Sequence, residues 1–170
     1  MNTLECIKTR RSIRDYIDKK IEKSDLAEIV ESGMYAPSAH NQQPREFYII
    51  TDKEKLNALS ENLEFGKMLT TSGGVVLVCF DKNKYTDMDF IQSDLGACTQ
   101  NMLLTAHEKG IGSVWIGVYP LNNRDHKINE ILNIPQQTEI FSIISLGYQS
   151  PSLSLRDKKC VFPEKIHWIE

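Results

Sequence analysis

The strongest constraint on the fold is a helical pattern of apolar residues that runs from about Asp87 to Lys109. The apolar positions recur at intervals of three and four residues, as on one face of an α-helix: Ile91, Leu95, Cys98, Met102 and Ala106. Leu103 and Leu104 widen this stripe, and Gly110 marks the C-terminal end of the helix. A helix with so broad an apolar surface must be covered by other layers of the protein.

Four segments with strand patterns surround this helix. Glu46–Thr51 and Ser113–Val118 are short and rich in β-branched and aromatic residues. Val75–Phe80 is apolar throughout, which predicts a strand buried on both faces. The last predicted strand is Thr138–Tyr148.

Four shorter segments have helical patterns: Thr3–Thr9, Ser24–Ala36, Asp52–Asn62 and Asn122–Leu132. In the first of these we expect Leu4 and Ile7 to face inward. In the second, Ser24 is a good N-cap, and Pro37 disfavours helical backbone at the residue before it. The apolar stripe of this second helix consists of Leu26, Ile29, Val30 and Met34.

These helices and strands do not alternate strictly, which favours an α+β fold over a doubly wound sheet. The chain has 170 residues, of which 41% are hydrophobic and 25% charged, so one globular domain over residues 1–170 is expected. Residues 149–170 contain two prolines and a run of charges, and we expect them to form an extended C-terminal tail.

The charge and the apolar runs exclude several classes of function. The net charge is −3 and the pI is about 5.8, so the chain lacks the basic field that nucleic-acid binding needs. Its longest apolar run, Val75–Phe80, is far shorter than the roughly 20 residues that cross a bilayer. Because the residues after Met1 also lack the apolar core of a signal peptide, we expect a cytoplasmic protein.

The reactive residue types do not form a metal or nucleophile motif. The four cysteines contain no CxxC pair, and no histidine lies at zinc spacing, so we expect reduced thiols and no metal. The sequence contains no phosphate loop of the GxxxxGK[ST] type, no GxGxxG after a strand and no GxSxG elbow. These absences argue against a nucleoside triphosphatase, a dinucleotide-binding Rossmann domain and a hydrolase triad.

Two basic clusters are candidates for binding an anion. Arg10, Arg11, Ser12 and Arg14 place three guanidinium groups and a hydroxyl within five residues, and arginine suits bidentate recognition of phosphate. A second cluster, Arg156–Lys159, lies in the tail. A solvated basic turn and a solubilising tail are the alternative interpretations of these clusters.

Two further segments suit a planar ligand. Pro37–Pro44 holds a dense set of neutral donors and acceptors between two prolines, which fits the carbonyl and imide edges of a heterocycle. Gly110–Gly117 places glycines around a strand, where the backbone can approach a planar ligand closely. A polar turn and a helix C-cap followed by a core strand are the structural alternatives.

Taken together and in order, five segments resemble the FMN-dependent nitroreductase family. They are TRRSIRDY (Thr9–Tyr16), APSAHNQQP (Ala36–Pro44), DLGACTQNMLLTAHEKGIGSVWIG (Asp94–Gly117), SLGY (Ser145–Tyr148) and KKCVFPEKIHW (Lys158–Trp168). The resemblance implies an α+β, nitroreductase-like fold with a central, mostly antiparallel sheet flanked by helices. It also implies a homodimer with FMN at the subunit interface and with the C-terminal tail extended onto the partner subunit.

The resemblance also implies a set of cofactor-binding residues. The phosphate end of FMN would meet Arg10, Arg11 and Ser12, with Lys158 and Lys159 closing over it. Arg14 would lie at the N1/O2 edge of the ring, Lys67 on its pyrimidine side, and the backbone of Ile116 and Gly117 near N5 and O4. The partner chain would line the flavin with Pro37, Ser38, Asn41 and Gln43. The sequence departs from the pattern of this family in two ways. Its tail has a lysine pair where the family usually has an arginine, and its chain is short, which leaves little room for a substrate lid.

This resemblance implies an enzyme that carries its chemistry on FMN and needs no catalytic side chain of its own. Hydride addition at N5 leaves negative charge at N1 and O2, where a fixed cation such as Arg14 favours the reduced form. NADH or NADPH would reduce the flavin, and a nitroaromatic, quinone or similar small-molecule acceptor would reoxidise it in a ping-pong cycle. Alternatives are a specialised reaction such as reductive dehalogenation, a non-catalytic flavin carrier or sensor, a module that binds an anionic partner, and a purely structural dimer.

Overall fold

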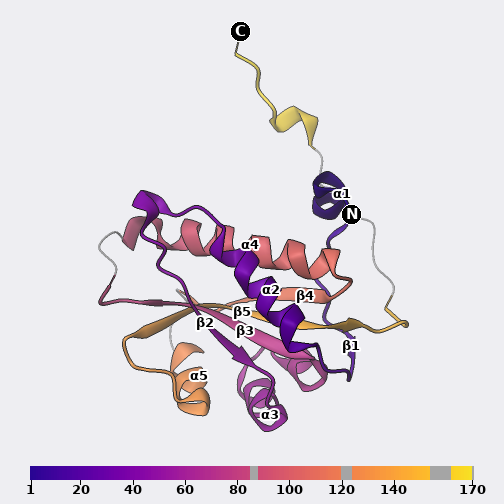
Figure 1. Ribbon diagram of the computed structural model, residues 1–170, viewed down its shortest axis with the longest axis vertical. Helices are drawn as coiled ribbons and strands as arrows, with labels where there is room; N and C mark the ends of the chain where they lie inside the picture. Colours follow the sequence, from indigo (N-terminus) through magenta and orange to yellow (C-terminus); the bar gives the residue numbers. More distant parts are fainter. Residues whose placement is uncertain (85–87, 120–123, 154–161, 170) are drawn as a thin grey trace.

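The protein folds around a five-stranded sheet in which all paired strands are antiparallel (Figure 1). The computed structural model describes residues 1–84, 88–119, 124–153 and 162–169. The long strand β5 (Thr138–Gln149) pairs with the other strands at the centre, namely β1 (Tyr16–Ile17), β3 (Gly74–Asp81) and β4 (Gly112–Gly117). β2 (Glu46–Ile50) pairs with β3 at the edge. The expected α+β fold with an antiparallel sheet is therefore confirmed.

Helices cover both faces of this sheet (Figure 1). α2 (Lys23–Met34) and α4 (Ile91–Glu108) lie on one face, and α3 (Lys53–Asn62) and α5 (Arg124–Leu132) lie on the other. α1 (Thr3–Thr9) lies beside the C-terminal end of α4. The shorter 3-10 helices are η1 (Ala39–Asn41), η2 (Lys67–Thr71), η3 (Met88–Phe90) and η4 (Pro163–Lys165).

The side chains of β3 alternate between two cores. Val76, Val78 and Phe80 pack under α2 and α4, whereas Val75 and Leu77 pack with α3 and α5. Because helices cover both faces, this strand has no polar face, as its apolar sequence predicts.

The apolar stripe of α4 is buried as predicted, although the helix is shorter than its sequence pattern. Ile91, Leu95, Cys98, Met102 and Ala106 are all buried. Residues 88–90 form η3 rather than the first turn of α4. Asp87 and Asn122, the first residues of two predicted helices, lie outside the described residues.

Two predictions for α2 are wrong. The N-cap is Glu22 rather than Ser24, because the backbone amide of Leu26 already bonds to the carbonyl of Glu22. Met34 is exposed, and Gly33 takes its place against α4, where a Cβ atom would lie 2.9 Å from Cys98 Sγ. The two helices therefore approach closely at a glycine, and this contact rotates the buried stripe away from Met34.

The orientation predicted for α1 is also wrong. Leu4 and Ile7 are 66% and 46% exposed, and Cys6 is the buried residue of this helix. α1 lies outside the two covered faces of the sheet and contacts α4 on one side, so its apolar residues remain on the surface of the single chain (Figure 1).

Sequence patterns missed β1 and η2. β1 has two residues, which is too short to show an alternating pattern. η2 is a single short 3-10 segment that packs Met68 and Leu69 into the core.

The contact between Tyr16 and Gly147 predicts a large effect on stability. A Cβ atom at Gly147 would lie 2.5 Å from Tyr16 Cγ, so Gly147→Ala must displace a buried ring. We expect this variant to lower the free energy of unfolding by about 1–3 kcal/mol. Urea denaturation at a fixed protein concentration measures the change.

Gly96→Ala is the matched control, because a Cβ atom there makes only an ordinary 3.7 Å contact with Trp115. It should leave stability unchanged or raise it by up to about 1 kcal/mol, since alanine suits a helix interior better than glycine. Equal losses for the two variants would contradict the role assigned to Gly147.

Candidate functional site

The segment from Arg10 to Tyr16 is bonded to α1 at its start and to the sheet from Ser12 onward. The backbone amide of Arg10 bonds to Cys6 O at the end of α1, and the amide of Ile13 bonds to Ser113 O at 2.9 Å. Ser12 forms an isolated parallel bridge with Ser113 of β4. The side chains of Ser12 and Arg14, which the sequence singles out, therefore project from backbone that is bonded to β4 or directly follows the bonded residues.

Tyr16 fixes the other end of this segment. Its ring is buried over Gly147, and its hydroxyl donates to the carbonyls of Ile13 at 2.7 Å and Ser145 at 3.2 Å. Burial raises the pKa of Tyr16 to about 12, so the hydroxyl stays protonated and remains a donor.

Arg10 and Arg11 carry buried donors with no partner among the described residues. Arg11 Nη1 donates to the carbonyls of Lys8, Thr9 and Arg10 at the C-terminal end of α1. Its Nε and the Nη1 of Arg10 are buried and unbonded. A buried donor of a charged group is costly to leave unpaired, so these atoms favour an anion beside them.

His107, on the last turn of α4, contacts this segment and was not singled out from the sequence. Its Nε2 lies 2.8 Å from the hydroxyl of Thr9. Partial burial and the guanidinium groups of Arg10 and Arg11 lower the pKa of His107. A single histidine within a long helical pattern gives no signal of such a contact.

Arg14 lies in a cavity that also contains the predicted strand residues. The cavity has a volume of about 280 Å³, and Arg14, Phe65, Met68, Val114, Trp115, Ile116 and Gly117 line it. A Cβ atom at Gly117 would meet nothing within 4 Å, so open space lies over the backbone there. The structure thus brings Arg14, Ile116 and Gly117 together in one cavity and places them against an apolar wall.

Lys67 is close in the sequence to two residues that line this cavity, but it does not line the cavity itself. Its neighbours Phe65 and Met68 do line it, and the Lys67 side chain is exposed at the start of η2. Phe65 and Met68 were not singled out from the sequence, because their segment carries no periodic pattern. Lys158 and Lys159 lie outside the described residues.

The polar loop Pro37–Pro44 is held over the first turn of α4. Both carboxylate oxygens of the buried Asp94 accept from the amide of Ala39 at 3.1 Å. The Ser38 hydroxyl accepts from the amide of Gln43 at 2.9 Å, and the Gln43 side chain donates to Asn41 Oδ1 at 2.9 Å. The backbone of this loop is left-handed at three non-glycine positions, namely His40, Asn41 and Gln43.

Two groups of predicted residues lie at opposite ends of α4: the polar loop over its first turn, and Arg10 and Arg11 beside its last turn. Asp94, under the loop, and His107, beside Arg10 and Arg11, are thirteen residues apart in the sequence. At 1.5 Å per residue this separates them by about 20 Å along the helix. The residues described as lining the Arg14 cavity include no member of the loop.

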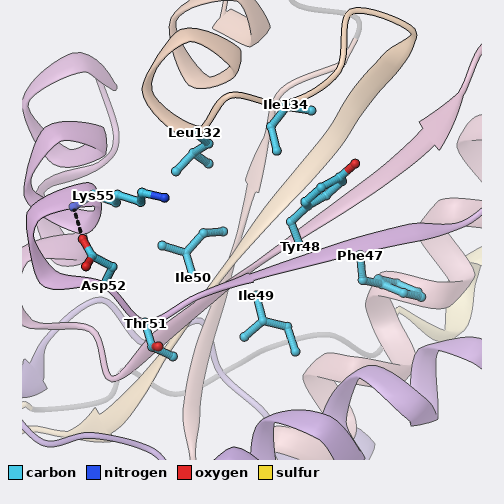
Figure 2. A pocket seen from close by; sticks show the side chains of 9 residues that line it. All are labelled: Phe47, Tyr48, Ile49, Ile50, Thr51, Asp52, Lys55, Leu132 and Ile134. Carbon is cyan, nitrogen blue, oxygen red and sulfur yellow. Dashed lines mark hydrogen bonds between the residues drawn. The ribbon is translucent and has the colours of Figure 1, made fainter.

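A second, larger cavity lies at the edge of the sheet, away from all the predicted residues. It has a volume of about 420 Å³ and follows β2 between α3 and the segment after α5. Figure 2 shows Tyr48 and Ile50 on the side of Leu132 and Ile134, with Phe47 and Ile49 on the other side of the strand. β2 pairs only with β3 within the described chain, so this cavity lies beside an open strand edge.

The rest of the described chain offers neither a metal cluster nor a membrane span. No three His, Cys, Asp or Glu side chains gather as metal ligands in residues 1–84, 88–119, 124–153 and 162–169. In the same ranges no helix has the length and apolarity needed to cross a bilayer. Cys6, Cys79 and Cys98 are free and buried.

Comparison with known proteins identifies the family to which this chain belongs. The profile of the nitroreductase family matches residues 7–64 and 61–148. The chain belongs to the nitroreductase family. It is therefore an oxidoreductase by membership, and the resemblance seen in the sequence is confirmed.

Individual nitroreductases cover almost the whole chain. A protein of Archaeoglobus fulgidus, provisionally named NADH dehydrogenase/NAD(P)H nitroreductase, is 41% identical over 96% of this chain and 97% of its own length. An FMN-dependent nitroreductase structure from Clostridium difficile R20291 has a TM-score of 0.85 at 31% identity and covers 98% of each chain. A provisionally named nitroreductase of Desulfovibrio desulfuricans, solved in complex with FMN, has a TM-score of 0.81 at 27% identity over 98% of this chain and 96% of that one.

The environment of His107 predicts how it titrates without a ligand. Because its pKa is lowered in the folded protein, the unfolded chain binds a proton at a higher pH than the folded chain does. Acidification from above pH 6.5 should therefore reduce the part of the stability that depends on His107, until the folded group itself is protonated.

Proton NMR of the ligand-free protein checks this prediction. The His107 ring signal, assigned by its loss in His107→Gln, should titrate at a lower pH in the folded protein than in the chain unfolded by urea. A His107 midpoint in the folded protein at or above that of the unfolded chain would contradict the burial and the arrangement of Arg10 and Arg11 described above.

Proposed function

We propose that this nitroreductase is an FMN-dependent oxidoreductase that uses NADH or NADPH to reduce nitroaromatic, quinone or similar small-molecule acceptors. The observation that carries the proposal is the pairing of unbonded buried guanidinium donors with a neighbouring cavity that holds Arg14 and the open backbone of Gly117. The guanidinium donors suit a phosphate, and the cavity suits a flat ring.

The donor set of Arg10 and Arg11 fits the phosphate of FMN. Arg10 Nη1 and Arg11 Nε are buried without a partner, and a phosphate dianion offers several acceptor oxygens for such donors. Ser12, bridged to Ser113, would add a hydroxyl next to them. Lys158 and Lys159 would complete the phosphate site as point charges.

The Arg14 cavity fits the ring. Arg14 would place a permanent positive charge at the N1/O2 edge, and Ile116 and Gly117 would present backbone near N5 and O4. Lys67 would reach the pyrimidine side. FMN, when bound there, supplies the hydride chemistry, so the task of Arg14 is to stabilise negative charge at the edge of the ring.

The apolar wall of the cavity suits a ping-pong order of substrates. Phe65 and Trp115 are 57% and 37% exposed at its rim, and they offer flat apolar surface to a nicotinamide or an aromatic acceptor. Both substrates would use the same face in turn, because one small cavity leaves no room for two aromatic rings beside a cofactor.

We propose that the working molecule is a homodimer, with each chain acting as one FMN-binding domain over residues 1–170. About 20 Å of α4 separates Arg10 and Arg11 from the polar loop, so Pro37, Ser38, Asn41 and Gln43 would reach the flavin of the partner subunit. Leu4 and Ile7 supply exposed apolar surface on α1 for such an interface.

The C-terminal tail gives a second argument for the dimer. Every residue of 162–169 is exposed, including Trp168 at 84%, and the tail extends away from its own sheet (Figure 1). An apolar tail of this kind is suited to lie on the partner subunit. The three free buried thiols agree with a reducing, cytoplasmic location.

The visible spectrum of the purified protein, recorded without oxygen before and after addition of NADH or NADPH, tests the cofactor and the reductive step. We expect an oxidised-flavin spectrum that bleaches on addition of the nucleotide. Arg14→Gln should retain FMN but slow bleaching by about two orders of magnitude, because it removes the charge at the N1/O2 edge. Lys20→Gln, which removes an exposed cation elsewhere, should bleach like the wild-type protein.

Each outcome of this experiment separates the alternatives. Flavin that does not bleach would indicate a carrier, a sensor or a specialised reaction. A protein that neither contains flavin nor takes up added FMN would contradict the proposal as a whole.

A heterodimer tests the shared site. One chain would carry Arg10→Ala and Arg11→Ala, and the other Ser38→Ala and Asn41→Ala. If each site draws on both chains, neither homodimeric variant should retain FMN, but the purified heterodimer should bind about one equivalent, because one of its two sites has both groups intact. Absorbance at the flavin band measures the content. A heterodimer without FMN would mean that both groups serve the same chain's site.

A further inference from the structure

We infer that His107 is a positioning residue for cofactor binding, and that it acts through Thr9 to hold the turn that carries Arg10 and Arg11. The inference rests on the proposed function, since it takes these arginines to be the phosphate site. His107 would not touch the cofactor. It would fix the direction in which the two guanidinium groups point.

The hydrogen bonds of Thr9 determine which atom of His107 carries the proton. The Thr9 hydroxyl has one hydrogen, and it donates to Glu5 O within α1 at 2.7 Å. The contact of 2.8 Å with His107 Nε2 must then run in the other direction, with the ring N–H donating to the hydroxyl oxygen. His107 is thus the donor that joins the last turn of α4 to the last turn of α1.

Partial burial lowers the pKa of His107, and the positive charges around the ring lower it further, so this donor is kept neutral. Arg10 and Arg11 face it from the segment after α1, and their like charge disfavours an imidazolium. Further charged groups near this junction include Glu108 and the N-terminal ammonium of Met1, which pair at 3.9 Å, and the exposed Glu5 and Lys8 of α1. A neutral donor holds the turn without adding a third positive charge that would repel the two guanidinium groups.

The junction needs such a contact, because α1 is otherwise weakly attached. Cys6 is its only buried residue, and its thiol donates to Leu104 O at 3.3 Å, one turn before Thr9. Thr9, which His107 holds through this bond, is the residue directly before Arg10. The Thr9 carbonyl also accepts a hydrogen bond from Arg11 Nη1. Loss of this bond would leave the arginine turn attached through its own backbone alone.

The experiment compares the affinities of the flavin-free protein for FMN and for riboflavin, which lacks the phosphate. His107→Ala and Thr9→Val should each weaken FMN binding by about three- to tenfold, the range expected for one lost hydrogen bond. Neither should change riboflavin binding. His107→Gln should bind FMN within about twofold of the wild-type protein, since its amide can donate from nearly the same position.

The combined variant Thr9→Val/His107→Ala adds a second criterion. Because both changes remove the same bond, its loss of FMN affinity should be close to that of either single variant rather than to their product. Thr9 lies on the exposed helix α1, so Thr9→Val tests the inference even where a change at His107 impairs folding.

The outcomes distinguish the inference from the proposed function. A wild-type protein that binds no flavin would overturn the proposed function. FMN binding that is unchanged in both Thr9→Val and His107→Ala would overturn the inference alone. Equal losses for FMN and riboflavin, or a failure of His107→Gln to restore affinity, would show a general structural role instead.

Discussion

The candidate site depends on one local constraint, the attachment of residues 10–16 to the sheet. Ile13 bonds through its backbone to Ser113, and Tyr16 is buried over Gly147, where a side chain larger than hydrogen would collide with its ring. Between these two anchors the chain has little freedom, so Arg14 must project beside β4. Arg14 is therefore placed by buried backbone and aromatic contacts, and not by an ion pair of the kind that usually holds a surface arginine.

The sequence predicts most of the fold, because the helices and strands that matter are long or fully apolar. β3 and α4 follow their patterns closely, since both are buried by layers on either side. The errors occur where tertiary contacts override a local preference. Gly33 displaces Met34 because two helices approach closely there, and α1 exposes Leu4 and Ile7 because it covers neither face of the sheet.

The candidate site is predicted less completely, for a different physical reason. Arg14, Ile116 and Gly117 come from segments whose composition already suggests a ligand, and the structure brings them together. Phe65 and His107 come from segments with no such signal. Tertiary packing brings Phe65 to the cavity and His107 to Thr9. The spacing of residues along the sequence does not reveal such contacts.

The open edge of β2 has a consequence for how the protein is made. This strand pairs on one side only within the described chain, exposes Ile49, and runs beside the cavity of about 420 Å³ (Figure 2). An uncovered edge of this kind is a template onto which any extended chain can add. No other strand of the described chain pairs with this edge, so each newly folded copy carries the liability. Native folding would then compete with edge-to-edge aggregation, and the yield of native protein would fall as the concentration of the chain rises.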